Sequence, residues 1–250
     1  MQTQPSFQRL RIMPDYPASQ KLWRYMSFSR FMWMLQRKLL WIARSDTLND
    51  PWELAITPTH LKEVRERAPI TPIGEEHRDT ADEHAAKVYQ HWRETTFISC
   101  WCASEHESHA LWQVFCGSME GVAIQTTVGT LEAQFGNVAF QKVNYDPPET
   151  LGRTLTFNDV ALLKRPFFNF EQEARAIFRA DTSNPNINKG EFGFEFPFDP
   201  GLLLNGVSIH PASDLSFYET VLWAIDDHAK SLRPRVSWSS MRERPPFQKP

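Results

Sequence analysis

Short apolar runs of strand length alternate with helix-like segments along this chain, and this alternation limits the fold more than any other feature. Strands are predicted at residues 22–26, 39–43, 96–102, 121–126, 138–145, 167–179 and 203–209. Helices are predicted after a capping Ser29 and at residues 108–115, 130–135, 158–164 and 215–232. Because 250 residues is an ordinary length for one domain, we predict a single α+β domain over residues 1–250.

One internal segment differs from the rest. Residues 60–94 are polar and favour helix, but Pro69, Pro72 and Gly74 interrupt them. We therefore predict a helical insertion here, with residues 69–82 as its most mobile part, because so polar a stretch has little apolar area to bury. The tail at residues 242–250 carries three prolines and is expected to fray.

Composition and charge exclude several classes of protein. With 9 Trp and 18 Phe the chain has too much aromatic surface for a disordered protein. The net charge of -3 and the pI near 6.2 argue against the basic face that binding of duplex nucleic acid requires. They do not exclude a local basic groove. No apolar run approaches the roughly 20 residues of a membrane span, and residues 1–14 lack a signal-peptide core, so we expect a cytoplasmic protein without a membrane partner.

The cysteines and histidines do not predict a metal site. Three cysteines are an odd number for a disulfide framework. Cys100, Cys102, His106 and His109 offer thiolates and imidazoles, but their spacing is not that of a common zinc finger. We predict free cysteines and no bound metal. The glycine-rich phosphate loops and the nucleophile elbow are also absent from the sequence.

Glu171, Glu173 and Arg175 place three charges at alternate positions. In a strand these side chains would share one face at steps of roughly 7 Å and could act together on a ribose or an orienting charge. In a helix, Glu171 and Arg175 would instead form an ordinary surface pair. On the strand interpretation we expect Glu173 to be an exposed cleft carboxylate that matters for activity and contributes little to stability.

Three other positions are candidates for ligand binding. Arg24 is a cation inside an apolar strand, so its side chain must either contact an anion or point outward to solvent. We expect it to face the carboxylates of Glu171 and Glu173 or a bound anion. Ser99 is a hydroxyl on an apolar strand and could bind a ribose or its own backbone. Asn49 is the first residue of the segment 49–53. A capped helix start would also explain the residue types of this segment.

These pieces, taken in order, resemble a bacterial family, the domain of unknown function 2971. The resemblance runs from about residue 22 to about residue 177. It is carried by Leu-Trp-Arg-Tyr at 22–25, Leu-Asn-Asp-Pro-Trp-Glu at 48–53, Phe-Ile-Ser-Cys at 97–100, Leu-Trp at 111–112, Gly-Val-Ala-Ile at 121–124, Val-Asn-Tyr at 143–145, Lys164, and Glu-Gln-Glu-Ala-Arg at 171–175. The family label by itself implies no activity.

The chain is also similar, more loosely, to the arginine-serine-glutamate class of ADP-ribosyltransferases. That resemblance rests on Arg24, Ser99, Glu171 and Glu173, although Ser-Cys-Trp stands at 99–101 where Ser-Thr-Ser is usual. It implies that Arg24 grips NAD near its phosphates or ribose, that Ser99 supports the nicotinamide ribose, and that Glu173 stabilises the ribosyl cation. We also expect Tyr25, Asn49 and Arg175 to be among the NAD-binding residues.

The resulting prediction is an α+β domain in which a bent mixed sheet with flanking helices frames a cleft, as in ADP-ribosyltransferases. NAD is the expected substrate, for transfer to an unknown protein or nucleic-acid acceptor or for hydrolysis. Phage defence or toxin biology is the expected setting, with an immunity protein as a further partner. Two alternatives stay open. One is a non-catalytic module that binds a nucleotide or a protein. The other is a magnesium-dependent nuclease built on Asp50, Glu53, Glu171 and Glu173.

Overall fold

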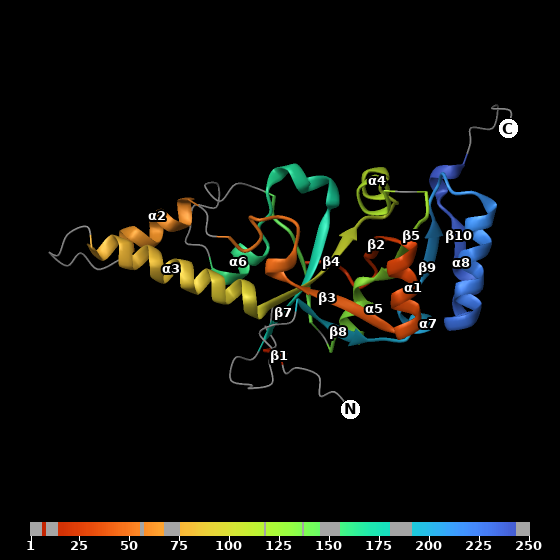
Figure 1. Cartoon of the computed structure of the whole chain (residues 1–250), viewed down its shortest axis with the longest axis horizontal. Coiled ribbons are helices and arrows are strands. Elements are labelled where there is room, and N and C mark those ends of the chain that lie inside the picture. The colour runs from red at the N-terminus through yellow and green to blue at the C-terminus, as the bar shows by residue number, and fades with distance from the viewer. Residues whose placement is uncertain are drawn as a thin grey trace.

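The computed structural model describes residues 7–8, 15–55, 58–67, 76–117, 119–136, 138–145, 156–180 and 192–243. In this part of the chain a mixed sheet carries helices on both faces (Figure 1). The order along the main path of the sheet is β1 (Phe7–Gln8), β7 (Glu173–Ala180), β4 (Thr96–Ala103), β2 (Lys21–Ser27), β5 (Gly121–Thr127), β9 (Gly206–Ile209) and β10 (Val236–Trp238). Three pairings lie off this path. β3 (Leu39–Arg44) pairs with both β4 and β8 (Gly193–Pro197), and β6 (Phe140–Lys142) pairs with β7. The pair β9–β10 is parallel and the other strand pairs are antiparallel.

The sheet divides at β4. One edge of β4 pairs with β7 from Thr96 to Cys102. The other edge is shared, because Cys102 and Ala103 pair with β2 while Phe97 and Ile98 pair with β3. Residues 99–101 have no strand partner on that edge within the described chain. The arms β2–β5–β9–β10 and β3–β8 therefore separate from a common strand and leave an opening between them, which confirms the predicted bent sheet.

The two faces of the sheet bury different clusters. Successive side chains of a strand point to opposite faces, and β2 follows this rule. Leu22 and Met26 enter the main core, whereas Trp23 and Tyr25 pack under α4 (His109–Cys116). On the main face, α1 (Phe28–Arg37) buries Phe31, Met34 and Leu35, which are spaced as one helical stripe. Also helical are α5 (Val128–Gln134), α6 (Phe157–Ala161), α7 (Pro200–Leu203) and α8 (Leu215–His228).

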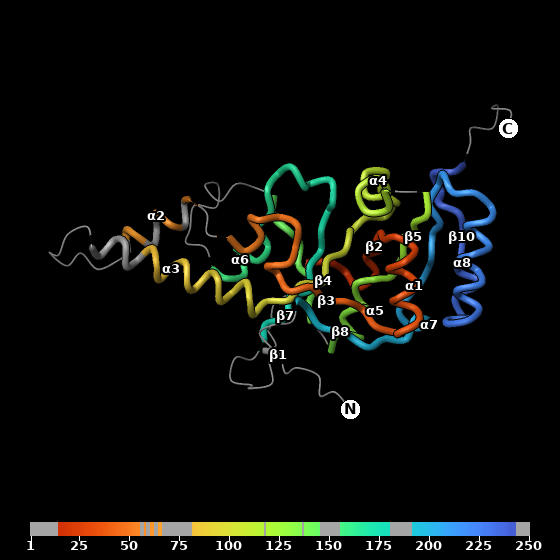
Figure 2. The backbone as a smooth tube through the Cα atoms, in the orientation of Figure 1, coloured from red at the N-terminus to blue at the C-terminus, as the bar shows by residue number. Residues whose placement is uncertain are grey.

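The predicted insertion forms two helices. α2 (Pro58–Arg67) and α3 (Glu76–Thr95) run together as an arm that points away from the sheet, at the end opposite α8 (Figure 2). Arg65 and Asp82 link the two helices by an ion pair. At the base of the arm, Trp92 of α3 contacts the ring of Phe157 at 5.2 Å between centroids. The stretch predicted to be most mobile, 69–82, lies partly outside the described residues, which resume at 76, and so does the tail beyond 243.

Several sequence predictions were wrong in detail. Ser29 does not cap α1, because the N-cap is Ser27. The segment after β3 forms a short 3-10 helix, Ser45–Thr47, and then turns rather than opening a helix. The strand expected at 138–145 is limited to β6, and the one expected at 203–209 begins within α7. The strands β1, β8 and β10 were not predicted. No helix among the described residues is both long enough and apolar enough for a membrane span.

Candidate functional site

A cleft of about 800 Å³ lies where β2 and β3 separate from β4. Its walls come from β2, the first half of α1, β3, the turn at 47–49, α4 and the two carboxylates Glu171 and Glu173. Cys100 and Trp101, from the unpaired edge of β4, form part of its floor. A hollow of this volume accepts a ligand the size of a nucleotide or a dinucleotide. The division of the sheet therefore creates the site.

Arg24 is the principal cation in this cleft. It projects from β2 across the opening, where its Nη2 lies 3.4 Å from the carbonyl oxygen of Trp41 in β3 and its guanidinium lies 5.6 Å from the ring of Trp101. No carboxylate of the described chain pairs with it. Burial lowers the pKa of Arg24, and nearby Arg30 lowers it further. A desolvated cation without a partner favours binding of an anion. Arg24 lies at the cleft as expected but makes no hydrogen bond with Glu171 or Glu173, so its contact with an anion stays a prediction.

The start of α1 adds further affinity for an anion. Ser29 and Arg30, in its first turn, both line the cleft. The N-cap Ser27 makes no side-chain capping bond, and the first turn of the helix contains no acidic residue. Helix N-termini favour negative groups through their free amides and their dipole. We refer to Arg24, Ser29 and Arg30 together as the arginine side of the cleft.

Aromatic rings form much of the remaining wall. Trp33 of α1, Trp41 of β3 and Phe115 of α4 all line the cleft. Trp41 is 39% exposed and Phe115 is 44% exposed, which leaves their rings open to a ligand. Exposed aromatic rings beside a cation suit a ligand that carries both planar rings and phosphate groups.

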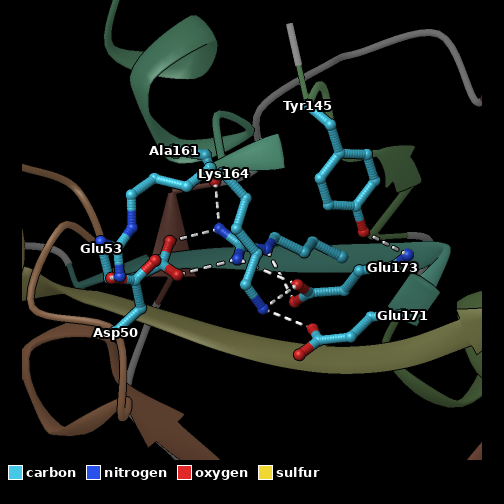
Figure 3. A network of polar contacts seen from close by, with 9 residues as sticks. Asp50, Glu53, Tyr145, Ala161, Lys164, Glu171 and Glu173 are labelled. Atoms are coloured by element: carbon cyan, nitrogen blue, oxygen red, sulfur yellow. Dashed lines mark hydrogen bonds and ion pairs between the residues drawn. The ribbon is translucent and has the colours of Figure 1, made fainter. Parts of the chain in front are cut away.

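The two carboxylates of the cleft, Glu171 and Glu173, belong to a network of polar contacts (Figure 3). Arg175 pairs with Glu53 and Glu173 in this network. Arg175 is fully buried in β7. Its Nε lies 2.8 Å from Oε1 of Glu173, its Nη2 lies 2.9 Å from Oε2 of Glu53, and its Nη1 lies 2.8 Å from the carbonyl oxygen of Ala161. Two further bonds, to the other oxygens of Glu53 and Glu173, use its remaining donors. Arg175 therefore has no donor left for a ligand.

Lys164 completes this network and was not among the predicted site residues. Its Nζ donates to Glu173 at 2.9 Å and also to Glu171, and it lies 4.8 Å from the centroid of the Phe168 ring. It stands seven and nine residues before the carboxylates that it bonds, which is too far for direct contact within one regular helix or strand. Only the tertiary fold brings these groups together, although Lys164 belongs to the sequence pattern that carries the first family resemblance.

The two glutamates of the cleft are not equivalent. Glu173 is 4% exposed, and both of its carboxylate oxygens are bonded to Arg175 or Lys164. Burial alone would raise the pKa of Glu173, but the two cations outweigh it and lower the pKa to about 2. For Glu171 burial prevails over the attraction of Lys164, and its pKa is raised. The expectation that Glu173 is exposed was wrong, since it is a buried member of an ion network.

Glu171 also departs from its predicted position. It ends a 3-10 helix, Pro166–Glu171, and does not belong to β7, which begins at Glu173. Between them Gln172 adopts a left-handed conformation with φ 43°. Neither the regular strand nor the regular helix considered from sequence is therefore correct at this point. The turn nevertheless brings both carboxylates to Lys164, so the predicted convergence of charges is present in another form.

The structure places the other predicted residues as follows. Asn49 is exposed and lines the cleft. Tyr25 also lines it, while its hydroxyl accepts a hydrogen bond from the amide of Ser108 at 2.7 Å. Ser99 is fully buried, accepts from Nε1 of Trp101 at 2.9 Å and does not line the cleft. Ser99 and Arg175 are therefore not positioned to contact a ligand in this cleft, because the core and the ion network occupy their polar atoms.

The carboxylates proposed for a magnesium site are already paired. Asp50 bonds Arg165 at 2.8 Å, and Glu53 bonds Arg175. Among the residues that the structure describes, no three histidine, cysteine, aspartate or glutamate side chains form a candidate metal site. Asp50, Glu53, Glu171 and Glu173 are each bonded to an arginine or a lysine, and they do not gather into one group that could coordinate a magnesium ion. The geometry thus gives the nuclease alternative no support.

Cys100 lies between the two sides of the cleft. Its thiol is hydrogen-bonded to Glu173, and it interacts electrostatically with Arg24. Burial raises the pKa of Cys100 well above its usual range, so the thiol stays protonated and neutral. None of the three cysteines, Cys100, Cys102 and Cys116, takes part in a disulfide. Cys100 is therefore a neutral part of the cleft floor, between the arginine side and the carboxylates of Glu171 and Glu173.

Comparison with solved structures gives matches to an ADP-ribosylated DNA complex and to two NAD-type complexes of one protein. Solved structures of DarT from Thermus sp. 2.9, in complex with ADP-ribosylated ssDNA, with carba-NAD+ and with NAD+, align at 12 to 14% identity with TM-scores of 0.41 to 0.42. The alignments cover 90 to 92% of this chain and 97 to 100% of those chains. TM-scores at this level do not establish a shared fold, so the site is interpreted from its own geometry. No family model matches the chain, and membership in the domain of unknown function 2971 stays a prediction. A search of the curated proteins finds no match.

Proposed function

We propose that this chain is an ADP-ribosyltransferase-like enzyme that uses NAD as its substrate. The observation that carries the proposal is the unpaired Arg24 in a nucleotide-sized cleft whose opposite wall holds Glu171 and Glu173. The diphosphate of NAD would lie against the arginine side, where Arg24, Arg30 and the start of α1 supply positive potential. Its planar rings would pack on Trp33, Trp41 or Phe115.

The carboxylate side supplies what the reaction requires. In NAD the bond from C1′ of the ribose to the nicotinamide nitrogen breaks, and its electron pair leaves with neutral nicotinamide. The ribosyl group becomes cationic as this bond lengthens, and a carboxylate in a dry pocket stabilises that charge. Water or an acceptor hydroxyl or amine then forms the new bond to C1′ and gives up a proton to solvent. The products are nicotinamide and either free ADP-ribose or an ADP-ribosylated acceptor.

The acceptor and the cellular setting belong to the same proposal. We further propose a cytoplasmic enzyme of phage defence or toxin biology, with a protein or nucleic acid as acceptor and an immunity protein as partner. A non-catalytic nucleotide-binding module is the second candidate. The full pairing of Glu173 favours it, because a carboxylate held by two cations is a weak partner for a third.

The experiment compares wild type with Arg24→Gln by calorimetric titration of NAD and by nicotinamide release. Loss of the cation removes a charged hydrogen bond worth about 1.5–3 kcal/mol, so we expect NAD binding at least tenfold weaker. Arg37→Gln is the matched control, because Arg37 lies on α1, is exposed and does not line the cleft. Equal NAD affinity in wild type and Arg24→Gln would contradict the placement of the diphosphate. Binding without nicotinamide release would favour the non-catalytic module.

A further inference from the structure

We propose that Glu171, rather than Glu173, is the carboxylate that faces the ribosyl group, and that Lys164 is the positioning residue that holds it there. This inference rests on the proposed use of NAD and assigns roles within the same cleft. It differs from the sequence-based expectation, in which Glu173 is the most sensitive residue. The contacts of the two carboxylates lead to the new assignment.

Glu173 has no free acceptor for a substrate. Oε1 receives Nε of Arg175 at 2.8 Å, and Oε2 receives Nζ of Lys164 at 2.9 Å and Nη2 of Arg175 at 3.1 Å. Its backbone amide donates to the hydroxyl of Tyr145 at 2.9 Å, which fixes the start of β7. Two adjacent cations already neutralise this carboxylate. Its negative charge therefore stabilises the protein rather than a developing cation in the cleft.

Glu171 retains the capacity that Glu173 lacks. Its Oε2 accepts from Lys164, while its Oε1 makes no hydrogen bond with any described residue. The side chain is 13% exposed and lines the cleft, so a ligand can reach the free oxygen. It has one cationic partner instead of two. A half-satisfied carboxylate at the wall of a cleft is the better group to meet positive charge on a ribose.

An unfavourable backbone conformation at the next residue, Gln172, holds Glu171 in this position. Gln172 has φ 43°, a left-handed conformation that residues other than glycine seldom adopt. Its carbonyl oxygen accepts from the amide of Ala103 at 2.8 Å, which ties the turn to the end of β4. Unusual backbone conformations tend to persist at functional sites. Here the left-handed turn is what moves Glu171 out of the strand and toward the cleft.

Lys164 connects the free carboxylate to the buried network. Its ammonium bonds Glu171 and Glu173 together, and its backbone amide donates to the carbonyl oxygen of Asn144 at 3.0 Å. Without this ammonium, Glu171 would lose both its anchor and the positive charge that offsets part of the effect of burial on its pKa. Lys164 is thus expected to act through Glu171 rather than on the substrate.

The first test separates the two glutamates. Wild type, Glu171→Gln and Glu173→Gln are compared for turnover of NAD, for NAD affinity by calorimetry and for melting temperature. We expect Glu171→Gln to lower turnover about a hundredfold while affinity and melting temperature change little. Glu173→Gln is expected to lower the melting temperature clearly and to retain more turnover than Glu171→Gln where it is still folded. Glu219→Gln, an exposed substitution on α8, controls for loss of one negative charge.

The second test concerns Lys164 and uses the dependence of turnover on pH. The charged and titratable groups that interact with Glu171 are Lys164, Glu173, Arg175, Cys102 and Tyr145. Ionised Glu171 is the active form, so turnover falls as pH drops through its pKa. Lys164→Met removes the cation that lowers this pKa, and the acid limb should move to higher pH. Lys164→Arg keeps the charge and should restore the wild-type limb.

The outcomes distinguish this inference from the proposed function. A wild type that leaves NAD intact contradicts the proposed function and the assignment with it. An active wild type whose Glu171→Gln variant is equally active contradicts the assignment alone. The same holds if folded Glu173→Gln is the inactive variant, or if Lys164→Met leaves the acid limb where it was. If Lys164→Met fails to fold, Lys164→Arg and the glutamate variants still decide the result.

Discussion

Two arginines of the same sheet meet opposite environments. Arg175 in β7 is fully buried and bonds two carboxylates and a carbonyl group. Arg24 in β2 is half-buried, and its contacts are a carbonyl oxygen at 3.4 Å and the face of Trp101. The first arginine is satisfied by the protein and the second is not. The difference indicates that Arg175 holds the fold together, while Arg24 is available to a ligand.

The largest expected effect is on stability, from Arg175→Met. Removing this guanidinium leaves Glu53 and Glu173 buried together without their main cation. Breaking a buried ion pair from one side typically costs about 3–5 kcal/mol. We expect a loss of this size in the free energy of unfolding, measured by urea denaturation. A variant as stable as wild type would show that the comparison between the two arginines is mistaken.

Glu173→Gln should have the next largest effect on stability. The substitution keeps the shape of the side chain but removes the charge that faces Arg175 and Lys164. We expect a loss of about 2–3 kcal/mol in the free energy of unfolding, which is smaller than for Arg175→Met because Glu53 still compensates Arg175. Urea denaturation of both variants in the same buffer checks this order. A larger loss in the free energy of unfolding for Glu173→Gln than for Arg175→Met would show that Glu173 is the centre of the network.

Acid should weaken the same network in a defined range of pH. The pKa of Glu173 is lowered from 4.5 to about 2 in the folded protein, so protons bind this carboxyl more readily after unfolding. Its stabilisation is therefore complete above the unfolded pKa and is lost as pH falls from about 4.5 toward about 2. Wild type and Glu173→Gln should converge in stability over that range. A difference in unfolding free energy that stays constant down to about pH 3 would argue against this coupling.

The smallest expected effect is that of Arg24→Met on stability. This variant loses a long hydrogen bond and the contact with Trp101, but it no longer holds a desolvated cation in the cleft. These changes oppose each other, and we expect the free energy of unfolding to stay within about 0.5 kcal/mol of wild type. A loss of several kcal/mol in urea denaturation would mean that Arg24 is structural, like Arg175.

The sequence predicted local features better than the site itself. The strands at β2, β3, β4 and β5 follow from short apolar runs, because such patterns are visible within a few residues. The division of the sheet does not, since it depends on β2 and β3 sharing one edge of a distant strand. Burial of Glu173 and Arg175 was missed for the same reason, because their partners Glu53 and Lys164 come from other elements.

Within the candidate site, some residues could be found from sequence and others could not. Arg24 was identifiable because a cation in an apolar strand is unusual. Ser99 was misplaced because a hydroxyl on a strand gives no sign of which face it occupies, and here it bonds Trp101 in the core. The turn at Gln172, which separates Glu171 from β7, has no glycine or asparagine to signal it.

The most direct test of the account is whether the purified chain releases nicotinamide from NAD. Proton NMR of a mixture of NAD and wild-type protein follows NAD, nicotinamide and ADP-ribose at the same time, with Arg24→Gln and Glu171→Gln measured alongside. We predict that nicotinamide appears with wild type and falls at least tenfold with either variant, because one loses the anion contact and the other the free carboxylate. Nicotinamide release that is equal in all three proteins, or absent from wild type with every acceptor supplied, would contradict the central claim.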